Sequence, residues 1–294
     1  MVDLAERDFE LARDLPAVLA LVADARARVH PHTFLHPGGL QWLLRRLGKA
    51  EFTARQWFDG DALTGFLIDD SGYVMVQAAS ANVEAHLRFV QLAEEARRAQ
   101  GHASVEVSVW EDDRELVVAL RSLGYEPSAG HEAGHELVHR IGGETAAPTL
   151  PDGFEMRWLE PGMDDAYVEL HRAAWSTVAP SKYDAMLHAA VVSMPQFDRT
   201  LVPVVAAPDG TLAAYCIAWF DPVTRTSEIE PLGTRPEYRR LGLARAVSLE
   251  AVRRSAERGA ESVLVWGVGD HRTALYESAG FRGGRVLREY ARRL

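Results

Sequence analysis

Apolar and polar positions alternate with two different periods in the second half of the chain. Strand-like runs predict strands at FEMRWLE (154–160), TLVPVVAA (200–207), TLAAYCIAWF (211–220), SEIEPLGT (227–234) and SVLVWGV (262–268). Helical spacing predicts helices over Met163–Val178, Lys182–Val192, Leu241–Gly259 and Arg272–Ala279, and a final strand begins at Phe281. This order predicts an α+β fold with a mixed central sheet flanked by helices.

A glycine turn joins one of these strands to the longest helix. The turn is RRLGLA (239–244), and Gly242 and Ala244 leave its backbone accessible to a ligand. The start of a helix presents unpaired N–H groups and the positive end of the helix dipole, which favour a phosphate. The turn has neither the GxxxxGK spelling of a P-loop nor the GxGxxG of a Rossmann turn.

The spelling RxxGxA, followed by DHRTALYESAGF (270–281), resembles the GNAT superfamily of acetyl-CoA-dependent N-acetyltransferases. The resemblance spans Phe154 to Leu294. It implies an enzyme that moves an acetyl group from acetyl-CoA to a primary amine by direct attack in a ternary complex, without a metal. It also implies a set of residues that contact acetyl-CoA: Leu232, Gly233, Thr234, Arg239, Arg240, Leu241, Gly242, Leu243, Ala244 and Asp270.

Catalytic roles follow residue by residue from the same resemblance. An ammonium group must lose a proton before it attacks, and Glu228 and Glu230 lie on one face of one strand, eleven and nine positions before Arg239. The family places its general base at such spacings, which nominates Glu228 first and Glu230 second. The alternative for both glutamates is a solvated strand edge. Tyr276 is the expected general acid, and the backbone N–H of Leu232 the expected oxyanion donor.

Pro231 interrupts the regular pattern of its strand, and Asp270 differs from the residue that the family usually has at its position. Pro231 lacks an N–H and interrupts sheet pairing, which is consistent with a strand that separates from its neighbour to admit the pantetheine arm. Asp270 stands where the family usually has asparagine, so an amide contact to the cofactor is lost. An aspartate at that place is still expected to cap the following helix.

A faint internal repeat predicts two copies of one fold. GHASVEVSVW (101–110) matches GAESVLVWGV (259–268), and VVALRSLGYEP (117–127) matches TALYESAGFRG (273–283). We therefore predict a degenerate GNAT-like domain over residues 1–141, a linker over 142–153 and a catalytic GNAT domain over 154–294.

The first copy lacks the features that would bind acetyl-CoA. In place of RRLGLA it has ANVEAH (81–86), which contains no glycine and carries Glu84, and Leu120 stands opposite Tyr276. A scaffold role is therefore expected for this half. The alternative is a separate ligand site, with candidates in the stretch HPHTFLHPGGLQW: His30, His32, His36 and Trp42.

The sequence offers two alternatives to an acetyltransferase, a zinc protease and a non-catalytic acyl-CoA-binding or sensory protein. The segment HEAGH (131–135) has the spacing of a zinc protease, but Gly130 and Gly134 disfavour the helix that such a site needs, and the repeat predicts a strand there. A non-catalytic acyl-CoA-binding or sensory protein could retain the fold. Trp175, Tyr183 and the loop 176–182 are expected to line the acceptor site, although they do not specify the acceptor.

The composition indicates the size of the core, the class of partner and the cellular compartment, but it does not indicate the reaction. The 294 residues, 47% of them hydrophobic, suffice for two cores, and the net charge of −10 argues against a nucleic-acid partner and favours a cationic small molecule. Cys216, the single cysteine, is expected to be a buried strand thiol. With no signal peptide and no membrane span in the sequence, we expect a cytoplasmic monomer or homodimer.

Overall fold

The computed structural model describes residues 4–49, 52–128, 134–143, 145–178 and 180–294. Contacts between residues divide the chain into two units. Unit 1 contains Met1–Pro37, Arg46–His135 and Arg285–Leu294, and unit 2 contains Gly38–Arg45 and Glu136–Gly284. Both units therefore include a segment that is distant in sequence from the rest of the unit.

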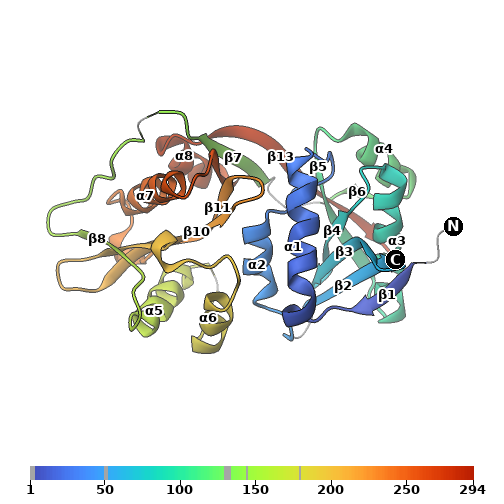
Figure 1. The fold of residues 1–294 in the computed structure, drawn as a ribbon, viewed down its shortest axis with the longest axis horizontal. Coiled ribbons are helices and arrows are strands. Elements are labelled where there is room, and N and C mark those ends of the chain that lie inside the picture. The colour runs from blue at the N-terminus through green and yellow to red at the C-terminus, as the bar shows by residue number, and fades with distance from the viewer. Residues whose placement is uncertain (1–3, 50–51, 129–133, 144, 179) are drawn as a thin grey trace. The chain divides into compact units, whose positions relative to one another are not determined.

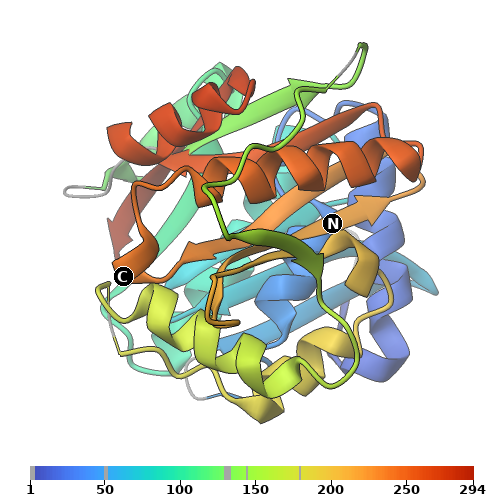
Figure 2. The ribbon, with the colours of Figure 1, turned by 90° about the vertical axis from the view of Figure 1, so that its left-hand side faces the viewer.

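Unit 2 contains a mixed sheet with helices on both faces. Its strands lie in the order β7-β12-β11-β10-β9-β8, where β11 and β12 are parallel and β8 to β11 are antiparallel neighbours. Helices α7 and α5 both pack on β10 and β11, and Figure 2 shows them on opposite sides of these strands. The elements are β7 (Gly134–Arg140), β8 (Glu155–Trp158), α5 (Asp164–Trp175), α6 (Ala185–Val192), β9 (Pro203–Ala206), β10 (Leu212–Asp221), β11 (Thr226–Thr234), α7 (Leu243–Glu257), β12 (Ser262–Val268) and α8 (Asp270–Ser278). Helix α2 (Pro37–Leu44) contributes the segment from Gly38 onward.

Unit 1 repeats this arrangement. Its strands lie in the order β1-β2-β3-β4-β5-β13, with β4 and β5 parallel and the other described pairs antiparallel. Helix α1 packs on β3, α3 packs on β3, β4 and β5, and Figure 1 labels each of these elements. They are β1 (Ala5–Asp8), α1 (Leu11–Ala27), β2 (Phe52–Asp59), β3 (Ala62–Asp70), β4 (Tyr73–Ala78), α3 (Val83–Ala99), β5 (Ser104–Trp110), α4 (Arg114–Ser122), β6 (Glu126–Pro127) and β13 (Arg282–Arg293).

The predicted fold class is confirmed, because each unit has a mixed sheet flanked by helices. Every strand and helix predicted between residues 154 and 281 is present, with ends shifted by a few residues. The halves also exchange their last strands, since most of β7 belongs to unit 2 and most of β13 to unit 1. The predicted linker at residues 142–153 stays a prediction. The contacts show which residues pack together, and they do not show where one copy of the fold ends in sequence and the next begins.

The core of unit 2 lies under α7. The helix buries the face predicted from its apolar spacing, which includes Leu243, Ala246, Val247, Leu249, Ala251 and Val252. Cys216 on β10 is fully buried against this face, and its thiol donates to the carbonyl of Val247 at 3.4 Å. The prediction of a buried strand thiol is therefore confirmed, and the packing fixes α7 against the strands that carry the candidate site.

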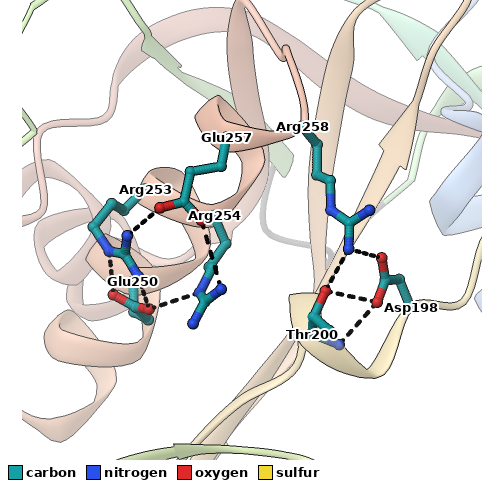
Figure 3. A network of polar contacts seen from close by, with 7 residues as sticks. All are labelled: Asp198, Thr200, Glu250, Arg253, Arg254, Glu257 and Arg258. Carbon is teal, nitrogen blue, oxygen red and sulfur yellow. Dashed lines mark hydrogen bonds and ion pairs between the residues drawn. The ribbon is translucent and has the colours of Figure 1, made fainter.

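Arginines on α7 hold a buried carboxylate (Figure 3). Glu250 is 3% exposed and accepts from Arg253 at 2.6 and 2.9 Å and from Arg254 at 3.1 Å. Burial acts to raise the pKa of Glu250, but the two guanidinium groups outweigh it and lower this pKa. Glu257 lies near the same arginines but is exposed. Arg258 pairs separately with Asp198 at 2.6 Å.

We expect Glu250→Ala to destabilise the protein by about 1–3 kcal/mol, because it removes several charged hydrogen bonds from a buried position. Glu257→Ala is the matched control and should cost less than about 1 kcal/mol, since exposed ion pairs contribute little. Urea unfolding followed by circular dichroism measures both. Equal losses for the two variants would contradict the assignment of Glu250 as the buried anchor of this network.

No helix in the described residues combines the length and the apolar character that crossing a membrane requires.

Candidate functional site

Strands β11 and β12 separate at the centre of unit 2. Their parallel pairing runs from Thr226 and Ser262 to Ile229 and Val265, yet β11 continues to Thr234 and β12 to Val268. The pairing of β11 with β10 also shifts here, because Ala218 faces Ile229 whereas Cys216 faces Leu232. One extra residue on β11 is therefore accommodated around Pro231, the position at which the sequence predicts the separation.

The turn at residues 239–244 leads from β11 into α7. Gly242 is the residue before the helix, has φ of 80°, and has open space where a Cβ would lie. No side chain caps this helix start, so its first N–H groups have no side-chain acceptor within the described residues. Arg240 also has a positive φ, of 67°, and Leu241 is 43% exposed. The turn therefore presents a helix N-terminus and exposed backbone, which suit an anion.

Arg239 fixes this turn to another helix. Its guanidinium donates to the carbonyl of Ala174 and to the hydroxyl of Thr177, both at 2.9 Å. The predicted contact of Arg239 with cofactor phosphates stays a prediction, because the side chain already has these two partners at the end of α5. Leu243, the first residue of α7, is buried, and Ala244 after it is partly buried.

The end of β11 contains the other predicted cofactor contacts. Leu232 is partly buried, and the Thr234 hydroxyl is buried without a hydrogen-bond partner in the described part of the chain. Gly233 packs so tightly that a Cβ would lie 2.6 Å from the Tyr215 ring and 2.9 Å from the Ala174 side chain. Glycine is therefore required at 233 by packing, which the sequence resemblance does not show.

Glu228 is buried and held by two donors. Its carboxylate accepts from the backbone N–H of Gly39 at 2.7 Å and from the indole N–H of Trp266 at 2.9 Å. The side chain is 3% exposed. This environment fixes a carboxylate in place, and it is not the solvated strand edge that the sequence left as an alternative.

Glu230 follows the last β11–β12 pair and has a different environment. Burial raises the pKa of its carboxyl to about 7, while the positive charge of Arg45 and the Trp42 side chain act to lower it. Its backbone carbonyl accepts from the Trp219 indole at 2.6 Å. A carboxyl with a pKa near 7 exchanges protons readily at neutral pH, as a general base must.

Tyr276 and Asp270 both lie on α8. Tyr276 is 7% exposed, and burial together with the nearby charge of Glu230 raises its pKa far above the usual value of 10. It therefore remains protonated at neutral pH. The expectation that Asp270 caps α8 is wrong: the cap position is Gly269, which has φ of 75°, and the helix begins at Asp270, two residues before the predicted start at Arg272.

Aromatic side chains gather beside these residues in unit 2. Tyr183 stacks on His171 with ring centroids 3.9 Å apart, and the Trp175 indole donates to the Tyr215 hydroxyl at 3.0 Å. Burial lowers the pKa of His171 to about 3, so this ring is neutral. Trp175 and Tyr183 are thus brought together, whereas residue 179 of the predicted acceptor loop lies outside the described residues.

Unit 1 has a different helix start at the corresponding position. The Asn82 side chain accepts from the backbone N–H of Glu84 at 2.7 Å and so caps α3. The His32 ring contacts His30 edge to face and His86 at a tilt, and His32 hydrogen-bonds Asp113. His36 is buried, whereas Trp42 belongs to unit 2.

Metal ligation gains no support from the described residues. No group of three or more His, Cys, Asp or Glu side chains among them is placed to hold a metal ion. Residues 131–133 of HEAGH lie outside the described part of the chain, and Gly134 and His135 begin strand β7.

The residues that sequence reasoning missed are neighbours of the two glutamates. The sequence singles out neither Gly39 nor Arg45, and it gives Trp42 only as a candidate for an alternative ligand site in the first half. Trp219 and Trp266 were also missed, because they lie in ordinary apolar strand runs. No local pattern reveals a contact between Gly39 and Glu228, which are 189 positions apart.

Comparison with known proteins finds a family that part of the chain resembles. Residues 163–281 match the model of the acetyltransferase (GNAT) family. The comparison with curated proteins gives no match. Among solved structures, a GCN5-related N-acetyltransferase from Sphaerobacter thermophilus is similar with 18% identity and a TM-score of 0.64, over 99% of this chain and 95% of that chain.

Two further structures are similar over nearly the whole length. A tandem GNAT protein from the clavulanic acid biosynthesis pathway has 15% identity and a TM-score of 0.70, over 99% of this chain and 98% of that one. The crystal structure of FemX has 10% identity and a TM-score of 0.62, over 99% and 97%. Such identities show the fold. Residues 163–281 are therefore similar to the acetyltransferase (GNAT) family, and the chain has a fold like that of a tandem GNAT protein.

Proposed function

We propose that unit 2 transfers the acetyl group of acetyl-CoA to a primary amine of a small molecule by direct attack. The observation that carries this proposal is the position of Glu230. It lies just past the last β11–β12 pair, its carboxyl has a pKa of about 7, and its charge acts on the Tyr276 hydroxyl. A carboxyl that can accept a proton near neutral pH and a hydroxyl that can donate one therefore influence each other where the strands part, which supports the proposal.

Glu230 is the better candidate for the base. Glu228 already accepts from two N–H donors, whereas the Glu230 carboxyl has a pKa matched to neutral pH. The alkyl ammonium, with a pKa near 10, is mostly protonated at neutral pH and must release a proton to become nucleophilic. The structure therefore favours the reverse of the order expected from sequence, with Glu230 as base and Glu228 as a residue that supports the strand.

The remaining roles use groups on neighbouring elements. Acetyl-CoA supplies an activated acetyl thioester. Glu230 takes one proton from the ammonium, and the neutral amine then forms the carbon–nitrogen bond. As the carbon–sulfur bond breaks, Tyr276 gives a proton to the sulfur and regains one from the nitrogen, which carries an extra proton after the attack. The N–H groups at the start of α7 suit the pyrophosphate, and the buried Thr234 hydroxyl suits an amide of the pantetheine arm.

Release of CoA tests the proposal. The protein is incubated with acetyl-CoA and, separately, with an amino sugar, an amino acid, a polyamine and a peptide, and the free thiol is followed with a thiol reagent. Release that increases with one of these amines supports acetyl transfer. Tight acetyl-CoA binding without amine-dependent release would favour a non-catalytic acyl-CoA-binding protein instead.

We expect acetyl-CoA to bind once per chain, because the start of α3 is capped by Asn82 whereas the start of α7 is open. Gly242→Glu should abolish this binding by placing a carboxylate at the phosphate position. Gly259→Glu is the matched control, since Gly259 also has a positive φ, of 91°, beyond the other end of α7. Calorimetry measures both. A stoichiometry near two, or binding that survives Gly242→Glu, would contradict this assignment.

A further inference from the structure

Arg239, the first residue of the turn before α7, is bound to the end of another helix. Its Nη2 group donates to the carbonyl of Ala174 and to the hydroxyl of Thr177, both at 2.9 Å. Ala174 lies in the last turn of α5, where carbonyls have no partner within the helix. The negative end of the α5 dipole also favours a cation at this place. The side chain of Arg239 therefore holds the end of α5 against the turn.

The two partners of Arg239 lie on either side of Trp175, the last residue of α5. The Trp175 indole is fixed separately, because it donates to the Tyr215 hydroxyl at 3.0 Å. Tyr215 in turn packs where β11 ends, since its ring would lie 2.6 Å from a Cβ at Gly233. Trp175 is partly exposed, so a ligand can contact it. A shift of the end of α5 would therefore move a ring that borders the candidate site.

One nitrogen of the Arg239 guanidinium remains available to a ligand. Nε approaches the carbonyl of Thr234 at 3.4 Å, and Nη2 has the two partners at the end of α5. Within the described residues Nη1 has no hydrogen-bond partner, and the side chain is exposed. A guanidinium is a rigid planar fork, so Nη1 can bind a phosphate oxygen while Nη2 keeps its partners. The uncapped start of α7 favours an anion on this same turn.

We propose that Arg239 couples the binding of the CoA pyrophosphate at the start of α7 to the position of Trp175 at the end of α5. Arg239 and Thr177 are then positioning residues for the acceptor site. The inference rests on the proposed function, in which unit 2 binds acetyl-CoA and an amine. It goes further by naming the contact through which the cofactor prepares the place of the amine. Because coupling between two sites is reciprocal, an amine that contacts Trp175 strengthens the binding of CoA in turn.

The physical basis of the coupling is the freedom that Arg239 loses. Arg239 is exposed, so without a ligand its contacts with α5 must overcome the entropy of a long, flexible side chain. A phosphate on Nη1 already restricts the guanidinium, which makes the contacts with Ala174 and Thr177 more favourable. The end of α5 is then held more tightly, and Trp175 has a narrower range of positions.

Thr177→Val is the decisive variant, because it removes the hydroxyl that accepts from Arg239 and keeps the size of the side chain. Protein labelled with ¹⁵N at the tryptophan indoles is titrated with CoA by NMR, and the Trp175 signal is assigned as the one missing in Trp175→Phe. We expect CoA to shift this signal in the parent, and the shift to be largely lost in Thr177→Val. The Kd for CoA should change by less than about 10-fold, since Nη1 is retained. Thr177→Ser, which keeps the hydroxyl, should respond like the parent.

Steady-state kinetics provides a second measure. At saturating acetyl-CoA, Thr177→Val should raise KM for the amine by about 2-fold to 10-fold, the contribution of one hydrogen bond, with kcat nearly unchanged. Thr200→Val is the matched control, because Thr200 is an exposed threonine of unit 2 whose hydroxyl accepts from Arg258 at 2.6 Å. It should change neither the response of the Trp175 signal to CoA nor KM.

A Trp175 signal that CoA shifts equally in the parent and in Thr177→Val would overturn the inference, since direct contact with the ligand does not require the Thr177 hydroxyl. An equal loss of the response in Thr200→Val would overturn it too. The titration needs no amine, so the inference can fail while acetyl transfer stands. Conversely, a response of Trp175 that requires Thr177, in a protein that releases no CoA from acetyl-CoA with any amine, supports the coupling and refutes the proposed function.

Discussion

Glu230→Gln should lower kcat/KM by about 100-fold to 10,000-fold at pH 7, the range that general base catalysis contributes. The parent rate should rise with pH through about 7, because the carboxyl must be ionised to accept a proton and its pKa is raised to about 7. In the variant this step in the profile should disappear. The rate should recover partly at alkaline pH, where more of the amine is already neutral. A pH–rate profile with one identified amine measures this.

Glu228→Gln is the matched control on the same strand. Glutamine offers one carbonyl oxygen to two N–H donors, Gly39 and Trp266, so one of them loses its acceptor. We expect a loss of stability of about 1–3 kcal/mol and a smaller loss of kcat/KM, with the step near pH 7 retained. Equal losses across pH for both variants would show that the carboxylates only position the acceptor.

Stability gives an independent measure of the Glu230 environment. Its pKa is raised in the folded protein above the usual value of 4.5, so folding disfavours the ionised form. The cost is absent below about pH 4.5 and complete above about pH 7. Relative to the parent, Glu230→Gln should therefore gain stability between pH 5 and pH 8 in urea unfolding. A variant equally destabilised at both pH values would indicate lost packing.

Tyr276→Phe should reduce turnover by about 100-fold to 10,000-fold with little change in acetyl-CoA affinity, because the ring remains and only the proton donor is lost. Single-turnover measurements separate the chemical step from product release. Tyr125→Phe is the control: Tyr125 is a fully buried tyrosine of unit 1 whose hydroxyl donates to Glu94 at 2.8 Å, and its loss should not change turnover. An unchanged chemical step in Tyr276→Phe would remove this residue from the mechanism.

Periodicity predicted the secondary structure of the second half because its elements satisfy local rules. The apolar face of α7 is buried as its spacing requires, and SVLVWGV coincides with β12. The start of α8 could not be placed, because a glycine with positive φ takes the cap position that an aspartate usually favours. The exchange of the last strands between the units also depends on tertiary contacts that no local pattern encodes.

The sequence predicts which strand carries the candidate base, but it does not predict which of the two glutamates on that strand has the raised pKa. Two glutamates on β11, the glycine turn and Tyr276 follow from local motifs. Burial raises the pKa of the Glu230 carboxyl to about 7, whereas the Glu228 carboxylate accepts from Gly39 and Trp266, and both environments depend on tertiary contacts. Sequence reasoning therefore ranks Glu228 first, whereas the environment of the two carboxyls favours Glu230.

Mass spectrometry with acetyl-CoA labelled in its acetyl group tests the central claim most directly. The account predicts an amine that gains one labelled acetyl group on nitrogen, a protein whose mass is unchanged during turnover, and loss of this product at pH 7 in Glu230→Gln. A labelled acetyl group retained on the protein, or a product formed equally well by Glu230→Gln, would contradict direct transfer assisted by Glu230.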